Sequence, residues 1–380
     1  MRSRVLLAPL IVLAAAAAAA AIAAPAVAAP AHRAPARHVA FSYLGETELP
    51  HALQVDGTTV GGLSGISWDA RTGRYLIISD DRSQTDPARF YTASIAARPG
   101  AVSVRLRSTE PLRQPDGSVF PPTSADGSVV APDPEGIAVD PRSRRFAWSS
   151  EGERKPAPLT LGDPAVRLAD PDGRTRRVLP LAPQLHMNAQ EVGPRQNQTL
   201  EGLSYTPKGD ALWAAMEDPL VQDGEDPTAT HGARVRFTEH SGQGLPIAQY
   251  AYPLEPLFEP GGATATNGVS DIAALGGGRF LVIERAFTTK NKIRVYEADA
   301  TRATDVLARD ALGSAPLTPM RKRLAVDLDA VRGLPRVDNV EGIAVGPRLP
   351  DGRRLVVLVS DDNFSTSQVT QVIAFAASGI

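Results

Sequence analysis

The sequence contains no cysteine, very few lysines and, beyond residue 40, no long stretch with helical periodicity. The absence of cysteine excludes a disulfide scaffold, thiolate zinc sites, iron–sulfur ligation and a thiol nucleophile. The 40 basic residues, only five of them lysine, nearly balance the 42 acidic residues, and a net charge of -2 argues against nucleic-acid binding through bulk charge. The G-x-S-x-G motif of α/β-hydrolases is missing, and the six histidines show no metal-binding spacing. The polar chemistry of the chain therefore rests on carboxylates and arginines.

The first 28 residues have the order of a secretory signal. Two arginines precede an alanine-rich apolar run over residues 5–24, and Ala26–Ala28 supplies the small residues that a signal peptidase reads. The alternative is an uncleaved membrane anchor, but alanine is only weakly apolar and prolines interrupt the run. We predict cleavage near Ala28, a flexible leader over residues 29–40, one domain over residues 41–380 and a secreted or extracytoplasmic location.

A four-residue phrase recurs through the rest of the chain. Its copies are Ser64–Ser67, Glu135–Ala138, Glu201–Ser204, Ser270–Ala273 and Glu341–Ala344. The second positions of the copies lie 71, 66, 69 and 71 residues apart. Each copy is followed by a turn and then by an apolar strand that ends in an acid, which is the pattern of a repeated β-hairpin.

Repeated strand pairs without intervening helices predict an all-β fold, a β-propeller with five visible repeats. A four-stranded blade needs about 40–50 residues, so the longer period leaves room for a sixth, degenerate blade within residues 103–130 or 233–256. We expect the strand at 41–49 to pair with residues 370–375, which closes the ring and removes an exposed edge. An elongated β-sandwich is the alternative, but it does not predict a fixed phrase at a fixed period.

The repeat predicts a cluster of carboxylates at one mouth of the central channel. The start and the end of a hairpin lie at the same end of a sheet, so the acids at these positions should converge. The acids concerned are Asp80, Glu135, Glu151, Glu201, Glu217, Asp271, Glu284, Glu341 and Asp361. Crowded carboxylates need positive charge, and calcium, a hard cation that prefers oxygen ligands, is the natural candidate. Arg82, Arg154 and Arg285 follow strand-end acids closely and add local positive charge. Alternatively, these acids have a purely structural role as acceptors for backbone N–H groups of neighbouring turns.

Two specific motifs stand near the end of the chain, Asp338–Gly342 and Ser360–Phe364, and related ones are Gly62–Ile66, Ser79–Arg82 and Leu200–Leu203. Together these motifs resemble the phytase-like family, described as having esterase-like activity of phytase. The resemblance covers roughly residues 60–376. It implies a relationship to the calcium-dependent propeller phytases, which bind phosphate over metal ions at one mouth of a six-bladed ring.

The resemblance also implies roles for individual residues. Glu135, Glu201, Glu341 and Asp361 would be metal ligands, and Asp362 joins the other mouth acids as a further candidate ligand. Glu201, Glu341, Arg82 and Arg285 would be catalytic, the two arginines holding the anion. Arg154, Asn339 and Asn363 would contact the substrate.

These observations together predict a monomeric hydrolase of phosphate esters or other small esters. Five lysines are few for gripping a highly phosphorylated inositol, so we do not expect efficient phytate hydrolysis. A calcium-stabilised lactonase or carboxylesterase and a non-catalytic binding propeller remain the alternatives. We expect no nucleic-acid partner and no stable membrane insertion after signal cleavage.

Overall fold

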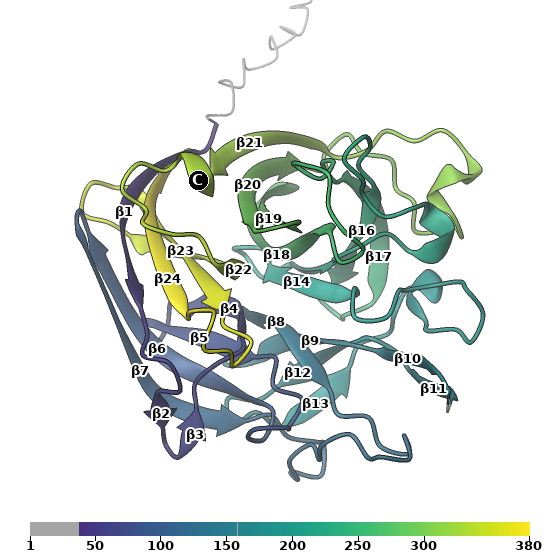
Figure 1. Cartoon of the computed structure of the whole chain (residues 1–380), viewed down its shortest axis with the longest axis horizontal. Coiled ribbons are helices and arrows are strands. Elements are labelled where there is room, and N and C mark those ends of the chain that lie inside the picture. Colours follow the sequence, from purple (N-terminus) through teal and green to yellow (C-terminus); the bar gives the residue numbers. More distant parts are fainter. Residues whose placement is uncertain (1–37, 158) are drawn as a thin grey trace, which may run out of the picture. The chain divides into compact units, whose positions relative to one another are not determined.

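The computed structural model describes residues 38–157 and 159–380 (Figure 1). The predicted signal and residues 29–37 of the predicted leader lie outside the described residues. In the described part of the chain, no helix has the length and apolar character needed to cross a membrane.

Five four-stranded antiparallel sheets make up the fold, which is a five-bladed β-propeller. Blade 1 consists of β4 (Leu63–Asp69), β5 (Arg74–Ser79), β6 (Arg89–Arg98) and β7 (Ala101–Pro111). Blade 2 consists of β8 (Asp133–Val139), β9 (Phe146–Glu151), β12 (Ala165–Ala169) and β13 (Thr175–Val178). Blade 3 consists of β14 (Leu200–Tyr205), β15 (Ala211–Met216), β16 (Arg234–Ser241) and β17 (Pro246–Pro253). Blade 4 consists of β18 (Thr266–Gly276), β19 (Arg279–Phe287), β20 (Asn291–Asp299) and β21 (Arg321–Asp327). Blade 5 consists of β22 (Asn339–Arg348), β23 (Arg354–Asp361), β24 (Gln371–Ser378) and β1 (Ala40–Glu48).

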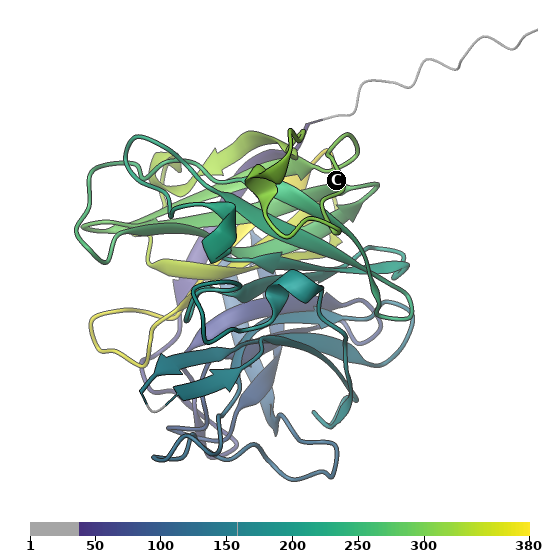
Figure 2. The ribbon, with the colours of Figure 1, turned by 90° about the vertical axis from the view of Figure 1, so that its right-hand side faces the viewer.

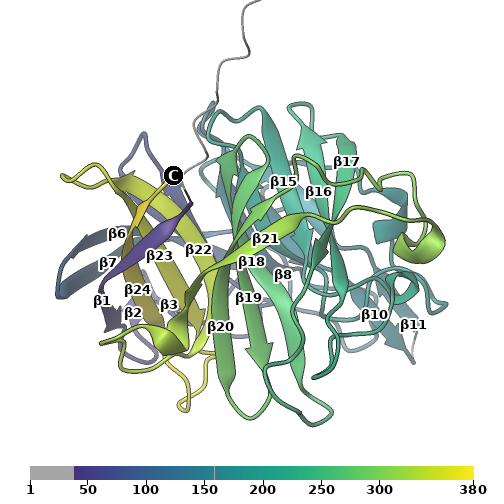
Figure 3. The same cartoon turned by 90° about the horizontal axis from the view of Figure 1, so that it is seen from above.

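Blade 5 closes the ring as the sequence predicts. The first strand, β1, pairs antiparallel with the last strand, β24, and Figure 3 shows the purple β1 alongside the yellow blade. The innermost strand of blade 5, β22, also contacts β4 of blade 1. Because the first and last strands of the propeller domain pair in one sheet, no strand edge is left unpaired where the ring closes.

The described residues form five blades and not six, because both regions that could have held a sixth blade have other places in the fold. Residues 233–256 form β16 and β17, the outer strands of blade 3, and residues 103–130 contain most of β7 and a connection to blade 2. The long period is taken up by loops, by two short hairpins and by four short 3-10 helices. The hairpins are β2 (Gln54–Val55) with β3 (Thr58–Thr59), and β10 (Glu153–Pro156) with β11 (Leu159–Gly162). The 3-10 helices are η1 (Pro183–Leu185), η2 (Val221–Asp223), η3 (Leu312–Ser314) and η4 (Leu328–Ala330).

The hydrophobic core lies between neighbouring blades. One cluster joins blades 2, 3 and 4, and others join blades 5 and 1, blades 4 and 5, and blades 1 and 2. Because each blade buries both faces, its second strand contains a continuous apolar run, which in β15 extends over the whole strand, Ala-Leu-Trp-Ala-Ala-Met.

The recurring phrase forms the narrow waist of the propeller. Its second residue is glycine in four repeats, and a Cβ atom at Gly136 would lie 2.4 Å from the carbonyl oxygen of Glu201 in the next blade. Gly65 meets the carbonyl of Glu135 at the same distance. Glycine is needed here because the inner strands approach one another through their backbones.

The fourth repeat has Asp271 at this waist position. Its carboxylate accepts hydrogen bonds from three backbone N–H groups, those of Leu203 at 3.3 Å, Ile272 at 2.7 Å and Ile343 at 2.8 Å. Asp271 is buried and ties blades 3, 4 and 5 together. It therefore satisfies backbone donors inside the waist, and the structure does not place it at the mouth.

Candidate metal centre at the mouth of the channel

A polar cavity of about 750 Å³ opens at the end of the channel where the inner strands begin. Its charged lining comprises seven acids and three basic residues: Asp80, Glu135, Glu201, Glu217, Asp338, Glu341, Asp361, Arg285, Lys290 and Arg336. We call this cavity the mouth. The loop that follows β23 and the β10–β11 hairpin project from the same side of the ring (Figure 2).

One structural position supplies a residue at or beside the mouth from every blade. This position lies at the end of the second strand of each blade. It pairs with the residue three places before the second residue of the recurring phrase, which we call the waist residue. Glu151 pairs with Asp133 and Asp361 with Asn339, while the N–H groups of Asp80 and Glu217 bond to the carbonyls of Gly62 and Thr199. In blade 4 the pair is Arg285 with Gly268. Of these five residues, Asp80, Glu217, Asp361 and Arg285 line the mouth, and Glu151 lies beside it, next to Glu201 and Glu217.

Glu284, which the sequence predicts at the mouth, does not reach it. In three repeats the strand-end residue comes 15 positions after the waist residue, but the shorter β18–β19 hairpin brings Arg285 there after 14. Successive side chains of a strand point to opposite faces, so a shift of one residue turns Glu284 away. Its buried carboxylate instead accepts hydrogen bonds from Tyr252 Oη at 2.7 Å and from Lys322, joining blades 3 and 4.

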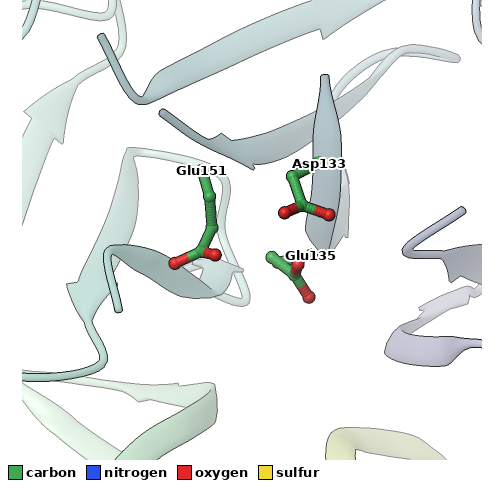
Figure 4. A group of neighbouring side chains, drawn as sticks. All are labelled: Asp133, Glu135 and Glu151. Atoms are coloured by element: carbon green, nitrogen blue, oxygen red, sulfur yellow. The ribbon is translucent and has the colours of Figure 1, made fainter. Parts of the chain in front are cut away.

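The acids of blades 2 and 3 form two groups that could each hold a cation. Asp133, Glu135 and Glu151 offer oxygen atoms that lie within 4.8 Å of one another, and so do Glu151, Glu201 and Glu217. Figure 4 shows the carboxylates of the first group turned toward a shared space. Calcium binds oxygen at about 2.3–2.6 Å, so two ligand oxygens on opposite sides of one ion lie about 5 Å apart. Both groups fit this limit, and Glu151 belongs to each.

Burial and mutual repulsion make these carboxylates hard to ionise. Burial raises the pKa of Glu135, Glu151 and Glu201 well above the ordinary value, and the charges of neighbouring acids raise it further. Burial also raises the pKa of Asp133 to about 6 and that of Glu217 to about 7. Without a cation, these acids therefore tend to keep their protons, and a bound cation would favour their ionised form.

Arg285 supplies positive charge at the centre of the mouth. Its Nη2 donates to Glu217 at 2.8 Å, and its Nε lies 3.5 Å from Glu341. Although burial alone would lower the pKa of Arg285, the carboxylates of Glu341 and Glu217 raise it, so the side chain stays protonated. Asn339 donates to Glu341 at 2.9 Å, and Asn363 also lines the mouth.

The other predicted site residues lie outside the mouth cavity. Arg82 bridges blades 1 and 2 through Glu153 at 2.9 Å and Asp133 at 3.3 Å, at the edge of the first carboxylate group. Arg154 donates to the backbone carbonyl of Pro194. Asp362 accepts from Gly62 N, Phe364 N and Thr370 Oγ1. Arg154 and Asp362 thus have structural partners that explain their positions.

Three acids at the site were not predicted as site residues from the sequence: Asp133, Asp218 and Asp338, which lines the mouth and pairs with Arg336. Asp133 lies two residues before Glu135, and alternate residues of a strand share a face, so this spacing was an available signal. Asp218 is fully buried beside Glu217, and neither of its carboxylate oxygens has a hydrogen-bond partner among the described residues. Nothing in the sequence shows that Asp218 turns inward, because it follows the end of its strand.

The phytase-like family model, described as esterase-like activity of phytase, matches residues 58–364. The chain belongs to this family. The match spans all five phrases and the strand-end residues of all five blades, and it covers the lining of the mouth except Ser367 and Gln368. No curated protein matches the chain significantly.

Solved structures similar to this chain include several glycoside hydrolases. A family 43 β-1,3-galactosidase bound to galactodeoxynojirimycin is 11% identical, with a TM-score of 0.46 over 86% of this chain and 94% of the other. An α-L-arabinofuranosidase from Lactobacillus brevis is 11% identical, with a TM-score of 0.47 over 83% of this chain and 91% of the other. A thermostable family 43 glycoside hydrolase is 13% identical, with a TM-score of 0.40 over 84% and 92%.

Proposed function

We propose that this chain is an exported, calcium-dependent hydrolase of phosphate esters or other small esters, with its active site at the mouth. The observation that carries the proposal is the pair of buried carboxylate groups that share Glu151. Family membership supports ester hydrolysis. Export rests on the signal pattern of residues 1–28.

The charge of the mouth makes a bound cation a condition for binding an anion. Seven acids against three basic residues would, where ionised, repel a phosphate ester. All three basic residues already have acidic partners: Arg285 with Glu217 at 2.8 Å, Arg336 with Asp338 at 2.7 Å and Lys290 with Asp329 at 3.4 Å. Calcium would reverse the sign of the local potential and so allow the anion to enter.

The donor set fits calcium, since it consists of carboxylate oxygens with the spacing that this ion accepts. Asp133, Glu135 and Glu151 would hold one cation, and Glu151, Glu201 and Glu217 would hold a second or alternative one. Asp361 and Glu341 also line the mouth. When bound, the cation supplies positive charge to the oxygens of the reacting ester.

The side chains of the mouth would orient the ester. Arg285 is held by Glu217 and Glu341, so its guanidinium has a fixed direction and can bind an anionic oxygen at its remaining N–H groups. Asn339 and Asn363 add neutral polar contacts to the lining. Arg82, further out, would steer the anion toward the acids of blade 2.

The lining of the mouth favours a polar substrate over a lactone with a long apolar chain. Phe287 and Val337 are the large apolar residues among those that line it. An apolar lactonase or carboxylesterase pocket would need a larger apolar wall.

Turnover of p-nitrophenyl phosphate and p-nitrophenyl acetate, measured in EDTA and in millimolar calcium, tests the proposal. We expect hydrolysis that EDTA abolishes and calcium restores, and that falls about 100-fold in Glu201→Gln. Glu191→Gln, at an exposed position, is the matched control and should keep wild-type activity. Hydrolysis that is insensitive to EDTA contradicts the metal role. Calcium binding without turnover of either ester would favour the binding propeller.

A further inference from the structure

A second cavity lies at the opposite end of the central channel. It has a volume of about 390 Å³, which falls in the range of about 300–1,000 Å³ that is usual for small-molecule sites. It shares no lining residue with the mouth, and the backbone contacts of the waist separate the two. We call it the far-end cavity.

The walls of the far-end cavity are largely apolar. All five blades contribute, through the ends of the inner strands and the turns that follow them. The apolar side chains include Ile66, Trp68, Leu203, Leu275 and Val345. Such a surface binds the hydrocarbon part of a ligand by removing it from water.

Two arginines stand at the rim of this apolar cavity. Arg348 in β22 and Arg354 in β23 are direct cross-strand partners, and both line the cavity. Like charges at directly opposed positions destabilise a sheet. Among the described residues neither arginine forms an ion pair, whereas the adjacent Arg353 is paired with Asp351 at 2.6 Å. The far-end lining contains no acidic side chain, and the terminal carboxylate of Ile380, which also lines it, forms no ion pair with either arginine among the described residues.

A buried hydroxyl close to these arginines also lacks a partner. Tyr75 is fully buried, and its Oη has no hydrogen bond among the described residues. The hydroxyl lies against Gly346, two residues before Arg348, where a Cβ atom would be only 2.1 Å away. Arg354 is near enough to act electrostatically on this hydroxyl, which lies behind the cavity wall because Tyr75 is not among the lining residues. Arg348 donates one hydrogen bond to the carbonyl of Gly352 at 2.8 Å, and its side chain forms no ion pair among the described residues.

We propose that the far-end cavity binds a small amphipathic monocarboxylate, with its carboxylate between Arg348 and Arg354 and its apolar body against the channel end. The charge of the rim selects an anion, and the apolar wall selects a hydrocarbon or aromatic body over a sugar. The size of the cavity limits the ligand to a small molecule. This site is independent of the acids at the mouth, so it does not need calcium.

Calorimetric titration of the whole chain with sodium octanoate tests this proposal, with 1-octanol and octylamine as neutral and cationic probes of the same length. We expect octanoate to bind, octylamine not to bind, and octanol to bind at least tenfold more weakly. Arg354→Gln and Arg348→Gln should each weaken octanoate binding about tenfold. Arg353→Gln is the matched control and should leave the affinity unchanged.

Absence of octanoate binding would overturn the proposal, as would equal binding of octanol or wild-type affinity in both Arg348→Gln and Arg354→Gln. The titration is repeated in EDTA and in millimolar calcium, and the affinity should be the same in both. If octanoate bound more tightly in calcium than in EDTA, the ligand would be placed at the mouth, and the proposal would also be overturned. Because ester turnover is measured separately, failure here leaves the proposed hydrolase function untouched.

Discussion

Replacing Arg285 by glutamine should destabilise the metal-free protein and leave the calcium-bound protein nearly unaffected. The guanidinium is 16% exposed and pairs with Glu217 and Glu341, whose side chains are 6% and 10% exposed. Removing one partner of a buried ion pair costs about 3–5 kcal/mol, and the partial exposure places this case near about 3 kcal/mol. An unfolding entropy of about 2.1 cal/mol/K per residue, over roughly 340 folded residues, converts this loss into a fall of roughly 4 °C in Tm.

Thermal unfolding followed by circular dichroism, in EDTA and in millimolar calcium, measures this effect. A bound cation neutralises the carboxylates that Arg285 otherwise faces, so calcium should remove most of the difference between variant and wild type. Arg353→Gln is the control for loss of an arginine at the surface and should change Tm by less than about 1 °C. An Arg285→Gln protein as stable as wild type in EDTA would refute the view that Arg285 stabilises the ionised carboxylates of Glu217 and Glu341.

Three further predictions concern the waist and the mouth. Asp271→Ala should lower the free energy of unfolding in urea by more than about 3 kcal/mol, because three buried N–H groups lose their acceptor. Asp271→Asn should lower it by less, and equal losses in the two variants would contradict the role of Asp271 as an acceptor. Gly136→Ala should lower the free energy of unfolding by about 1–3 kcal/mol or more, because the added methyl group overpacks the waist. Gly313 has open space around it, so Gly313→Ala should change the stability very little. Similar effects of the two substitutions would argue against a tight waist. The raised pKa values of Asp133, about 6, and Glu217, about 7, mean that the folded state holds protons that the unfolded state has released, so in EDTA the stability should fall as pH rises from about 4 to 7. A flat or rising profile over that window, measured as Tm against pH, would contradict the shifts.

The overall architecture was predictable because the sequence repeats. The five phrases predict five inner strands, and the structure confirms the all-β propeller and the pairing of the first strand with the last. The number of blades was left open between five and six, because a period near 69 residues does not distinguish long loops from an extra blade. The resemblance to the phytase-like family is also confirmed.

The composition of the mouth was less predictable, because it depends on single-residue register. A hairpin one residue shorter exchanges Glu284 for Arg285 at the mouth, and no residue count along the sequence reveals this. Asp271 occupies a position where the other repeats have glycine, and only the structure shows three amides directed at its carboxylate. Asp218 was missed because its inward direction is set by the loop after β15.

The most direct test of a cation site at the mouth is the Tm of the protein in excess EDTA and again in millimolar calcium. Binding to the folded state alone stabilises it by about 2.7 kcal/mol when calcium is present at 100 times its Kd, which corresponds to a rise of roughly 4 °C. We predict a rise of this size that is lost in the double variant Glu201→Gln/Glu341→Gln. An unchanged Tm in calcium, or an equal rise in the double variant, would contradict a metal site at the mouth.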